Sequence, residues 1–392
     1  MNPIIPNAEF RVIHVFPYSA NWAGGHTNAA IAIMKAQRQH GIEVRGLSPF
    51  SAGIPSALWR SVETLPVQEL DFTAPNPGQG ALELAAGCSR PIFHFHGFME
   101  RFVPVGRELT KAGIPYVITS QGQLHYRQIV HWAMKFVYLN FVTRFFRNAS
   151  GLHFTTQRAR TRCRYLIPGW ERPVLVQHNL VEVPDPATVS PASREHHGIP
   201  ARAFLFAYLG RLDIEHKGLD VLVRSLAGLP SGSHLHLALI GPDWARGKWR
   251  LQRLAQRLNC AANVHFLGPH YGNDKWDLLR MADAFVSPSR WEACSSAVAE
   301  AIAFGLPTVV SERMNAAMEF AAEGAVLTVA VSPGALSKAM HQMANDLQLR
   351  QSLREAGLNW TREHCSLQKA GARFRDFYLQ VLRETKVPRP LV

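Results

Sequence analysis

The chain alternates short apolar runs with longer amphipathic segments over most of its length. The opening run RVIHVFPYS predicts a buried strand, and a loop with Gly24 and Gly25 then leads into a helix that ends near Gly41. Further strands are predicted at residues 42–47, 91–96, 116–120, 151–155 and 173–178. Strands that alternate with helices indicate a parallel sheet covered by helices.

A segment rich in proline and serine, EVPDPATVSPASREHHGIP, interrupts this alternation. We interpret residues 183–203 as a linker, which assigns residues 1–182 to an N-terminal domain. The alternation restarts at AFLFAYLG and predicts a second domain at 204–365, followed by a final helix and tail at 366–392. Two domains are also what 392 residues are expected to form.

Composition narrows the class of protein. With 47% hydrophobic residues the chain can bury large cores, yet no apolar run reaches the roughly 20 residues of a membrane helix. The N-terminus has no basic region followed by an apolar core. We therefore expect a cytoplasmic protein, either dissolved or attached to the inner face of the cytoplasmic membrane. The five cysteines show no metal-ligand spacing, so we expect free thiols and no metal site.

The net charge of +13 predicts attraction to polyanions, which include nucleotide donors, anionic lipids and nucleic acids. The basic residues are dispersed and form no nucleic-acid-binding pattern, so we expect no nucleic-acid partner. A predicted helix at 128–147 mixes aromatic and basic side chains and would suit a peripheral contact with an anionic membrane. Its apolar residues cover most of its circumference, which suits a core helix equally well, and both interpretations stay open.

The segment WEACSSAVAEAIAFGLP at 291–307 holds two carboxylates, Glu292 and Glu300, on either side of a predicted helix start. Ser295 or Ser296 can cap that helix. The N–H groups at a helix start favour an anion such as a diphosphate, and carboxylates accept hydrogen bonds from sugar hydroxyls. The segment therefore suits a nucleotide-sugar site.

The segment GRLDIEHKG follows a buried strand and carries Arg211 and Lys217 at the two ends of a short loop. A guanidinium and an ammonium group together can stabilise the charge on a departing nucleotide, as a metal ion would. A divalent metal would then be unnecessary. The alternative is a solvated basic loop.

Two further groups stand at strand ends in the first half. His94 and His96 alternate in FHFHGF and share one face of a strand, and His96 lies at its carboxyl end. We interpret His94 as a packing residue and His96 as a functional candidate. Gly24 and Gly25 either let the backbone approach a phosphate or form a tight turn.

The segment 291–307, with its preceding strand and the following AIAFGLPTVVS, resembles the signature of the retaining glycosyltransferases of family 4. The order and spacing of Gly210, Arg211, Lys217 and Gly218 resemble the same family. The resemblance implies an α/β protein of the GT-B fold, in which two Rossmann-like domains face each other across a cleft. It also implies a final helix, at 366–383, that crosses back to the first domain.

The resemblance assigns roles to individual residues. Catalytic roles fall to His96 and Glu292 at the sugar and to Arg211 and Lys217 at the leaving phosphate. The implied donor-binding residues are Gly24, Gly25, Gly210, Phe266, Leu267, Cys294, Ser295, Ser296 and Glu300, with Glu319 as a further acidic position. The implied acceptor-binding residues are Tyr18, Trp22, Gln121, His125 and Arg127.

The implied reaction is the transfer of a hexose from a UDP-, GDP- or ADP-linked sugar to a hydroxyl group, without metal or other cofactor. The implied acceptor is a saccharide or lipid-linked saccharide of bacterial surface polysaccharide or glycolipid assembly. Two alternatives stay open. One is a noncatalytic GT-B subunit, because the family has glycine at the position of Ser295 and a glycine-rich turn at 315–317. The other is a GT-B nucleotide-sugar epimerase, which would need no acceptor.

Overall fold

A computed structural model describes residues 9–15, 25–48, 67–69, 76–88, 90–98, 101–120, 136–229 and 233–385. The chain divides into two compact units. The first combines Met1–Leu180 with His364–Val392, and the second is Val181–Glu363. Six predicted site residues lie outside the described residues, namely Tyr18, Trp22, Gly24, Gln121, His125 and Arg127.

The first unit is built on a seven-stranded parallel sheet with the order β3-β2-β1-β4-β5-β6-β7. Every residue of β1 and nearly all of β4 are buried, as expected for strands covered on both faces. The strand order reverses at β1 and β4, and ligands of such sheets bind beside the carboxyl ends of the strands at that point. The strands are β1 (Arg11–Val15), β2 (Glu43–Ser48), β3 (Val67–Glu69), β4 (Pro91–His96), β5 (Tyr116–Thr119), β6 (Gly151–Phe154) and β7 (Val174–Val176).

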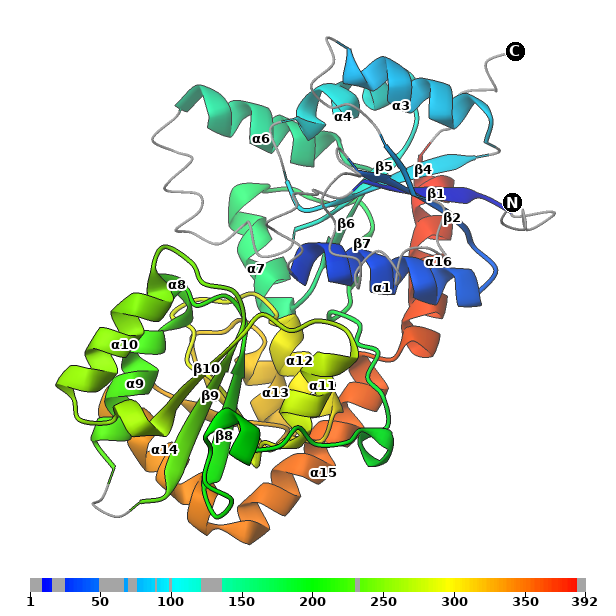
Figure 1. Ribbon diagram of the computed structural model, residues 1–392. Coiled ribbons are helices and arrows are strands. Elements are labelled where there is room, and N and C mark those ends of the chain that lie inside the picture. The colour runs from blue at the N-terminus through cyan, green and yellow to red at the C-terminus, as the bar shows by residue number, and fades with distance from the viewer. Residues whose placement is uncertain are drawn as a thin grey trace. The chain divides into compact units, whose positions relative to one another are not determined.

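Helices cover both faces of this sheet, with α3 and α4 on one side and α1 and α16 on the other (Figure 1). The last helix, α16, packs closely on α1, because a Cβ at Gly371 would lie only 2.5 Å from Ala36 O. The helices of this unit are α1 (Gly25–Gln39), α3 (Pro77–Ala86), α4 (Phe102–Lys111), α6 (Phe136–Asn148), α7 (Gln157–Leu166) and α16 (Leu367–Glu384).

The second unit is built on a six-stranded parallel sheet with the order β10-β9-β8-β11-β12-β13. Its strand order reverses at β8 and β11, so the carboxyl ends of these two strands are the expected ligand position. Both units are therefore doubly wound α/β domains, as the sequence predicts. The strands are β8 (Phe204–Leu209), β9 (Leu235–Ile240), β10 (Val264–Gly268), β11 (Ala284–Ser287), β12 (Thr308–Ser311) and β13 (Leu327–Val329).

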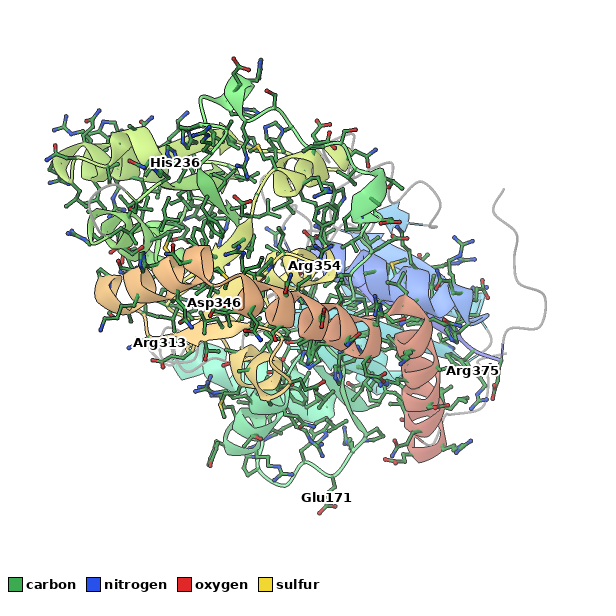
Figure 2. The ribbon with its side chains drawn as sticks, turned by 90° about the horizontal axis from the view of Figure 1, so that it is seen from below. Glu171, His236, Arg313, Asp346, Arg354 and Arg375 are labelled. Carbon is green, nitrogen blue, oxygen red and sulfur yellow. The ribbon has the colours of Figure 1, made fainter. Side chains whose placement is uncertain are left out.

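The helices α9, α10 and α14 pack on one face of this sheet and α11, α12 and α13 on the other (Figure 1). Asp346 lies where α14 passes into α15, and its carboxylate accepts a hydrogen bond from Leu349 N at 2.9 Å (Figure 2). The helices are α8 (Ile214–Lys217), α9 (Leu219–Ala227), α10 (Gly247–Arg257), α11 (Asn273–Arg280), α12 (Ser296–Ala303), α13 (Ala317–Ala322), α14 (Pro333–Asn345) and α15 (Leu347–His364).

Residues 183–203, which the sequence analysis interprets as a linker, are fastened to the second unit. Ala192 N donates to Asp277 O at 2.9 Å. The guanidinium of Arg194 donates to Met281 O at 2.6 Å and to the Asp283 carboxylate at 2.9 Å. The segment contains two short 3₁₀ helices, Pro186–Thr188 and Glu195–His197.

The helix predicted at 128–147 is described only from Phe136 onward, as α6. In this part Phe145 and Phe146 are 3% and 1% exposed, so this end of the helix packs in the core. The cysteines are all free, as the sequence predicts. Among the described helices, none combines the length and the apolar character that crossing a membrane requires.

Candidate functional site

The backbones at the carboxyl ends of β8 and β9 touch each other directly. Gly210 follows β8 and Gly241 follows β9, and both have φ of +149°, a value that favours glycine. A Cβ on Gly241 would lie 2.0 Å from Gly210 O, which no side chain can accommodate. Gly241 N in turn donates to Gly268 O at 2.7 Å, which ties the end of β10 to the same edge. The predicted donor residue Gly210 therefore sits in a tightly built strand-end layer.

The loop after β8 is pressed against the loop after β11. The Asp213 carboxylate caps α8 by accepting from His216 N at 3.0 Å. Gly218 adopts the left-handed conformation with φ of +66°, and a Cβ there would lie 2.4 Å from Pro288 O. Arg290 N donates to His216 O at 2.9 Å. These contacts fix the position of Lys217, which lies between His216 and Gly218.

Lys217 and Glu292 form a hydrogen-bonded ion pair between these two loops. Their side chains are 16% and 15% exposed, so the pair is largely shielded from solvent. His216 Nε2 lies 3.9 Å from the same Glu292 oxygen, and its ring stacks on Trp291 with centres 4.7 Å apart. Burial lowers the pKa of His216, although the charge of Glu292 opposes that effect. Two residues predicted for catalysis thus meet in one ion pair, beside a histidine that the sequence analysis did not select.

Arg211 is held by an aromatic ring and a carboxylate. Its guanidinium carbon lies 4.4 Å from the centre of the Trp244 ring, and its Nη2 lies 3.8 Å from Asp213 Oδ2. The hydroxyl of the buried Tyr208 donates to Arg211 O at 2.9 Å, which fixes the backbone as well. The side chain is 30% exposed, so an anion in solvent can reach it. A cation in this setting suits binding of a phosphate group.

The second carboxylate, Glu300, lies on α12 and pairs with a lysine of α11. Lys275 Nζ donates to Glu300 Oε2 at 2.9 Å, with side chains 17% and 16% exposed. The same nitrogen lies 4.2 Å from the centre of the Trp276 ring. Lys275 is not predicted from the sequence, because nothing in its own segment indicates a partner on another helix.

The start of α12 differs from the prediction in one detail. Ser295 occupies the N-cap position, but its side chain accepts no capping hydrogen bond. The backbone ahead of the helix is instead fixed from outside, because Asn315 N donates to Glu292 O at 2.8 Å and Ala316 N donates to Ala293 O at 3.2 Å. The turn at 315–317 therefore holds the Glu292 loop in place.

Residues 189–360, which include every predicted donor residue of the second unit, match the family model of the glycosyl transferases group 1. The second unit belongs to the glycosyl transferases group 1. No curated protein matches the chain.

Solved structures of similar fold cover nearly the whole chain. HepE from Anabaena, in complex with UDP and glucose, aligns with a TM-score of 0.76 at 18% identity, over 94% of this chain and 99% of its own. Sucrose-phosphate synthase from Thermosynechococcus elongatus gives 0.75 at 18% identity, over 95% and 100%. WaaG, a glycosyltransferase involved in lipopolysaccharide biosynthesis, gives 0.65 at 17%, over 93% and 99%. The chain therefore has the GT-B fold, as the sequence predicts.

The remaining predicted residues lie in both units. In the second unit, Phe266 and Leu267 are half-buried in β10, Cys294 is buried, and Glu319 lies in the first turn of α13. In the first unit, Gly25 begins α1, directly after the undescribed Gly24.

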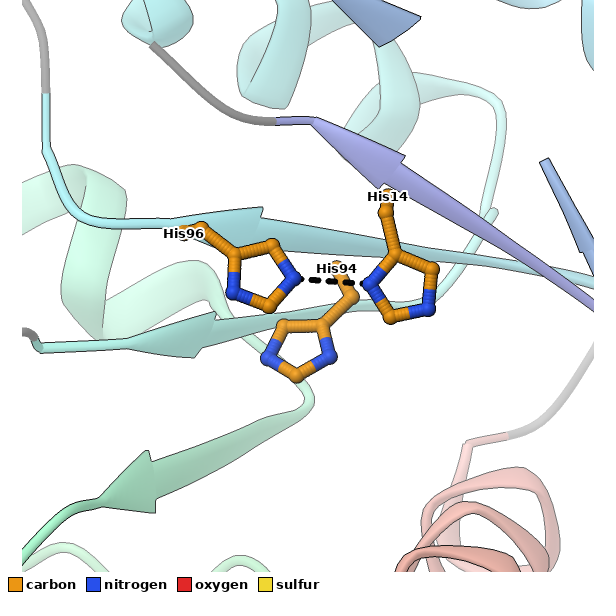
Figure 3. A group of neighbouring side chains, drawn as sticks. All are labelled: His14, His94 and His96. Carbon is orange, nitrogen blue, oxygen red and sulfur yellow. Dashed lines mark hydrogen bonds between the residues drawn. The ribbon is translucent and has the colours of Figure 1, made fainter. Parts of the chain in front are cut away.

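His96 is the last residue of β4 in the first unit and is fully buried. Its Nε2 lies 2.7 Å from His14 Nδ1, on the neighbouring strand β1 (Figure 3). His94, interpreted from the sequence as a packing residue, uses both ring nitrogens in hydrogen bonds, to Tyr378 and Thr119. His14 is not predicted from the sequence, where it is only a histidine within an apolar run.

Proposed function

We propose that this group 1 glycosyltransferase is a retaining enzyme that transfers a hexose from a nucleotide sugar to the hydroxyl group of a saccharide or lipid-linked saccharide. The observation that carries the proposal is the shielded Lys217–Glu292 ion pair at the carboxyl ends of β8 and β11. There the cation can bind the diphosphate of a sugar nucleotide, and the carboxylate can accept hydrogen bonds from its sugar hydroxyls. The similar fold of HepE, in complex with UDP-glucose, supports a nucleotide sugar as the donor.

The leaving diphosphate is the first group that the site must bind. Its negative charge grows as the glycosidic bond breaks, and fixed cations stabilise that charge more strongly where water is partly excluded. Arg211 is held by Trp244, and Lys217 is 16% exposed, so both are positioned before the donor arrives. In this proposal the two cations replace a divalent metal. The backbone at Ser295 and Ser296 adds the positive end of α12.

The two carboxylates bind hydroxyl groups of the donor. Glu292 accepts a hydrogen bond from the transferred sugar, and Glu300 accepts from the ribose. Lys275 fixes the orientation of Glu300 through its 2.9 Å hydrogen bond. The family resemblance adds His96 of the first unit as a second group that orients the sugar.

Bond changes follow from these roles. The acceptor oxygen bonds to the anomeric carbon on the face from which the diphosphate leaves, and the bond from that carbon to the phosphate oxygen breaks with its electron pair on the phosphate. The departing phosphate oxygen takes the acceptor's proton. No side chain forms a covalent bond, and configuration is retained. The carboxylate of Glu292 stabilises the positive charge that develops on the sugar in the transition state.

The proposed acceptor rests on the fold similarity to WaaG. WaaG is involved in lipopolysaccharide biosynthesis, and its fold is similar to that of this chain. An acceptor from bacterial surface polysaccharide or glycolipid assembly is consistent with that similarity. The enzyme would then work in the cytoplasm, where a peripheral contact with the membrane gives access to a lipid-linked acceptor.

A transfer assay tests the proposal. Purified protein is incubated with radiolabelled UDP-glucose, then with GDP- and ADP-linked sugars, in the presence of bacterial glycolipid extract and EDTA. We expect label in the glycolipid, with the donor's anomeric configuration in the product by NMR. Glu292→Gln should lower kcat by about 100-fold, as loss of a group that stabilises a transition state does. Glu215→Gln, at a side chain 76% exposed, is the matched control and should leave kcat unchanged. An inverted product, or transfer abolished by EDTA, would refute the mechanism.

A further inference from the structure

A continuous chain of hydrogen bonds crosses the buried interior of the first unit. Its members come from four strands, two helices and the residue that follows β7, and each is at most 2% exposed. The chain ends at a backbone carbonyl, which can only accept hydrogen bonds. In order, the members are His96, His14, Gln37, Tyr378, His94, Thr119, His153 and the carbonyl of Gln177.

The first half of this hydrogen-bond chain joins β1 and β4 to the helices α1 and α16. His96 Nε2 lies 2.7 Å from His14 Nδ1, and His14 Nε2 lies 2.8 Å from Gln37 Oε1. Gln37 Nε2 donates to Tyr378 Oη at 2.9 Å. Tyr378 Oη lies 2.7 Å from His94 Nδ1. The last helix, α16, is thereby connected to His96 through two side chains.

The second half crosses the sheet from β4 to β7. His94 Nε2 lies 2.6 Å from Thr119 Oγ1, which lies 2.8 Å from His153 Nδ1. His153 Nε2 lies 2.9 Å from Gln177 O. All of these distances are those of ordinary hydrogen bonds, so each contact has one donor and one acceptor.

His14, His94 and His153, which lie inside the hydrogen-bond chain, are neutral at pH 7. Burial lowers the pKa of His14 and of His153 to about 4. Burial and the neighbouring histidines lower the pKa of His94 well below its usual value. A neutral imidazole donates from one nitrogen and accepts at the other, so the direction of one hydrogen bond at each ring fixes the direction of the other.

The carbonyl of Gln177 sets that direction. Because the carbonyl accepts, His153 Nε2 carries the hydrogen and His153 Nδ1 accepts. Thr119 must then give its only hydrogen to His153, so it accepts from His94 Nε2. His94 Nδ1 is therefore an acceptor.

The direction of the hydrogen bonds is fixed in the same way from His94 to His96. Tyr378 gives its only hydrogen to His94 Nδ1, so it must accept from the amide nitrogen of Gln37. That orientation turns the Gln37 oxygen towards His14, whose Nε2 donates to it. His14 Nδ1 is left as an acceptor, and His96 Nε2 must donate to it.

We propose that this hydrogen-bond chain holds His96 in the Nε2–H tautomer. Tyr378 is the positioning residue, because it donates to His94 and accepts from Gln37 and so fixes the orientation of the Gln37 amide. In neutral His96, Nδ1 is then an acceptor, on the side of the ring away from His14 (Figure 3). Any group that meets this nitrogen must donate a hydrogen bond to it. For the transfer reaction, and resting on the proposed function, this selects a sugar hydroxyl over a ring or bridging oxygen as the partner of His96.

A metal ion is the competing occupant of this cluster. His14, His94 and His96 each offer a nitrogen, and these atoms lie within 4.8 Å of one another. However, His14 and His94 already use both nitrogens in the hydrogen-bond chain. A bound ion would therefore have to break the chain, which makes the two interpretations distinguishable.

The test is ¹⁵N NMR of the full chain labelled at histidine, without substrate. Two-bond correlations separate protonated from unprotonated ring nitrogens, and single histidine substitutions assign them. We expect His14, His94, His96 and His153 all as Nε2–H tautomers, with resonances unchanged by Zn²⁺. Nδ1–H at His96, or a stoichiometric Zn²⁺ shift at His14, His94 and His96, would overturn the proposal. This measurement needs no variant of Tyr378.

A matched pair of variants tests the role of Tyr378. Tyr378→Phe removes the link between Gln37 and His94, so Gln37 can turn over and His14 and His96 should populate both tautomers. Tyr116→Phe is the control, because Tyr116 is also buried and donates to Phe145 O at 2.7 Å outside the chain. It should leave both histidines unchanged. Identical His96 spectra in the two variants would refute the positioning role.

Activity provides a separate readout. We expect Tyr378→Phe to lower kcat about tenfold, the effect of one hydrogen bond, while the donor KM changes little. If the tautomers are as stated but no transfer is found with any donor, the proposed function fails and the hydrogen-bond chain stands. If transfer is found but the tautomers differ, the hydrogen-bond chain fails alone.

Discussion

Lys275 and Glu300 join two helices on the same side of the second sheet, with Lys275 Nζ donating to Glu300 Oε2 at 2.9 Å. Both side chains are less than one-fifth exposed, at 17% and 16%. The two residues are 25 positions apart in the sequence, and Lys275 Nζ lies 4.2 Å from the centre of the Trp276 ring. Glu300 is the proposed ribose ligand, so its orientation depends on a residue of α11 outside the recognised motif.

A double-mutant cycle should detect this pair. We expect Lys275→Met and Glu300→Gln to show a coupling of about 1 kcal/mol in the free energy of unfolding, because the pair is partly shielded from solvent. Urea denaturation of the wild type, the two single variants and the double variant gives the coupling. The exposed Arg250–Glu215 pair, at 3.5 Å with side chains 45% and 76% exposed, is the control and should show almost none. Strict additivity at Lys275 and Glu300 would contradict the prediction.

The contact between the ends of β8 and β9 predicts a large cost for a single methyl group. Gly241→Ala would place Cβ 2.0 Å from Gly210 O at a φ of +149°, so the strand ends must separate. We expect a loss of at least about 2 kcal/mol in the free energy of unfolding, together with weaker donor binding. Gly334→Ala is the control, because no atom lies within 4 Å of its Cβ position in α14. Equal stability of the two variants, measured by urea denaturation, would show that this edge can relax.

The fold follows from local sequence patterns to a large extent. Strands buried on both faces are continuous apolar runs, and the predicted strand at 91–96 coincides with β4. Short edge strands are different. β3, β7 and β13 have three residues each, and only β7 falls within a predicted strand, at 173–178.

The pairing of site residues is less predictable, because it depends on contacts between distant segments. Glu292 and Glu300 stand out because they lie beside one helix start. Lys217 is 75 positions from Glu292, and only the packing of two loops brings them together. His14 and His96 are 82 positions apart and meet because β1 pairs with β4. A histidine in an apolar strand indicates a buried side chain, but the sequence does not show which residue that side chain contacts.

The buried histidines predict that acid destabilises the first unit. His14 and His153 have a pKa of about 4 in the folded protein and about 6.5 in the unfolded chain. Between these values the unfolded chain binds more protons, so the free energy of unfolding falls as the pH falls below 6.5. Each histidine contributes up to about 1.4 kcal/mol per pH unit. His94, whose pKa is also lowered, adds to the same trend.

Hydrogen exchange checks this pH dependence. Amide exchange in β4, corrected for the intrinsic effect of pH, should report weaker protection at pH 5.5 than at pH 7.5. The His153→Gln variant removes one titrating ring and should show a smaller difference between the two pH values. Protection that is equal or stronger at pH 5.5 in the wild type would contradict the prediction.

Calorimetric titration with nucleotide sugars tests the donor site most directly. UDP-, GDP- and ADP-linked sugars are titrated in EDTA into the wild type and into Arg211→Ala, Glu300→Ala and the surface control Arg250→Ala. We expect one nucleotide class to bind to the wild type and the control. Arg211→Ala and Glu300→Ala should each weaken that binding by at least about tenfold, the loss of one charge-assisted hydrogen bond. Absence of binding by every nucleotide sugar, or wild-type affinity in both site variants, would contradict this expectation.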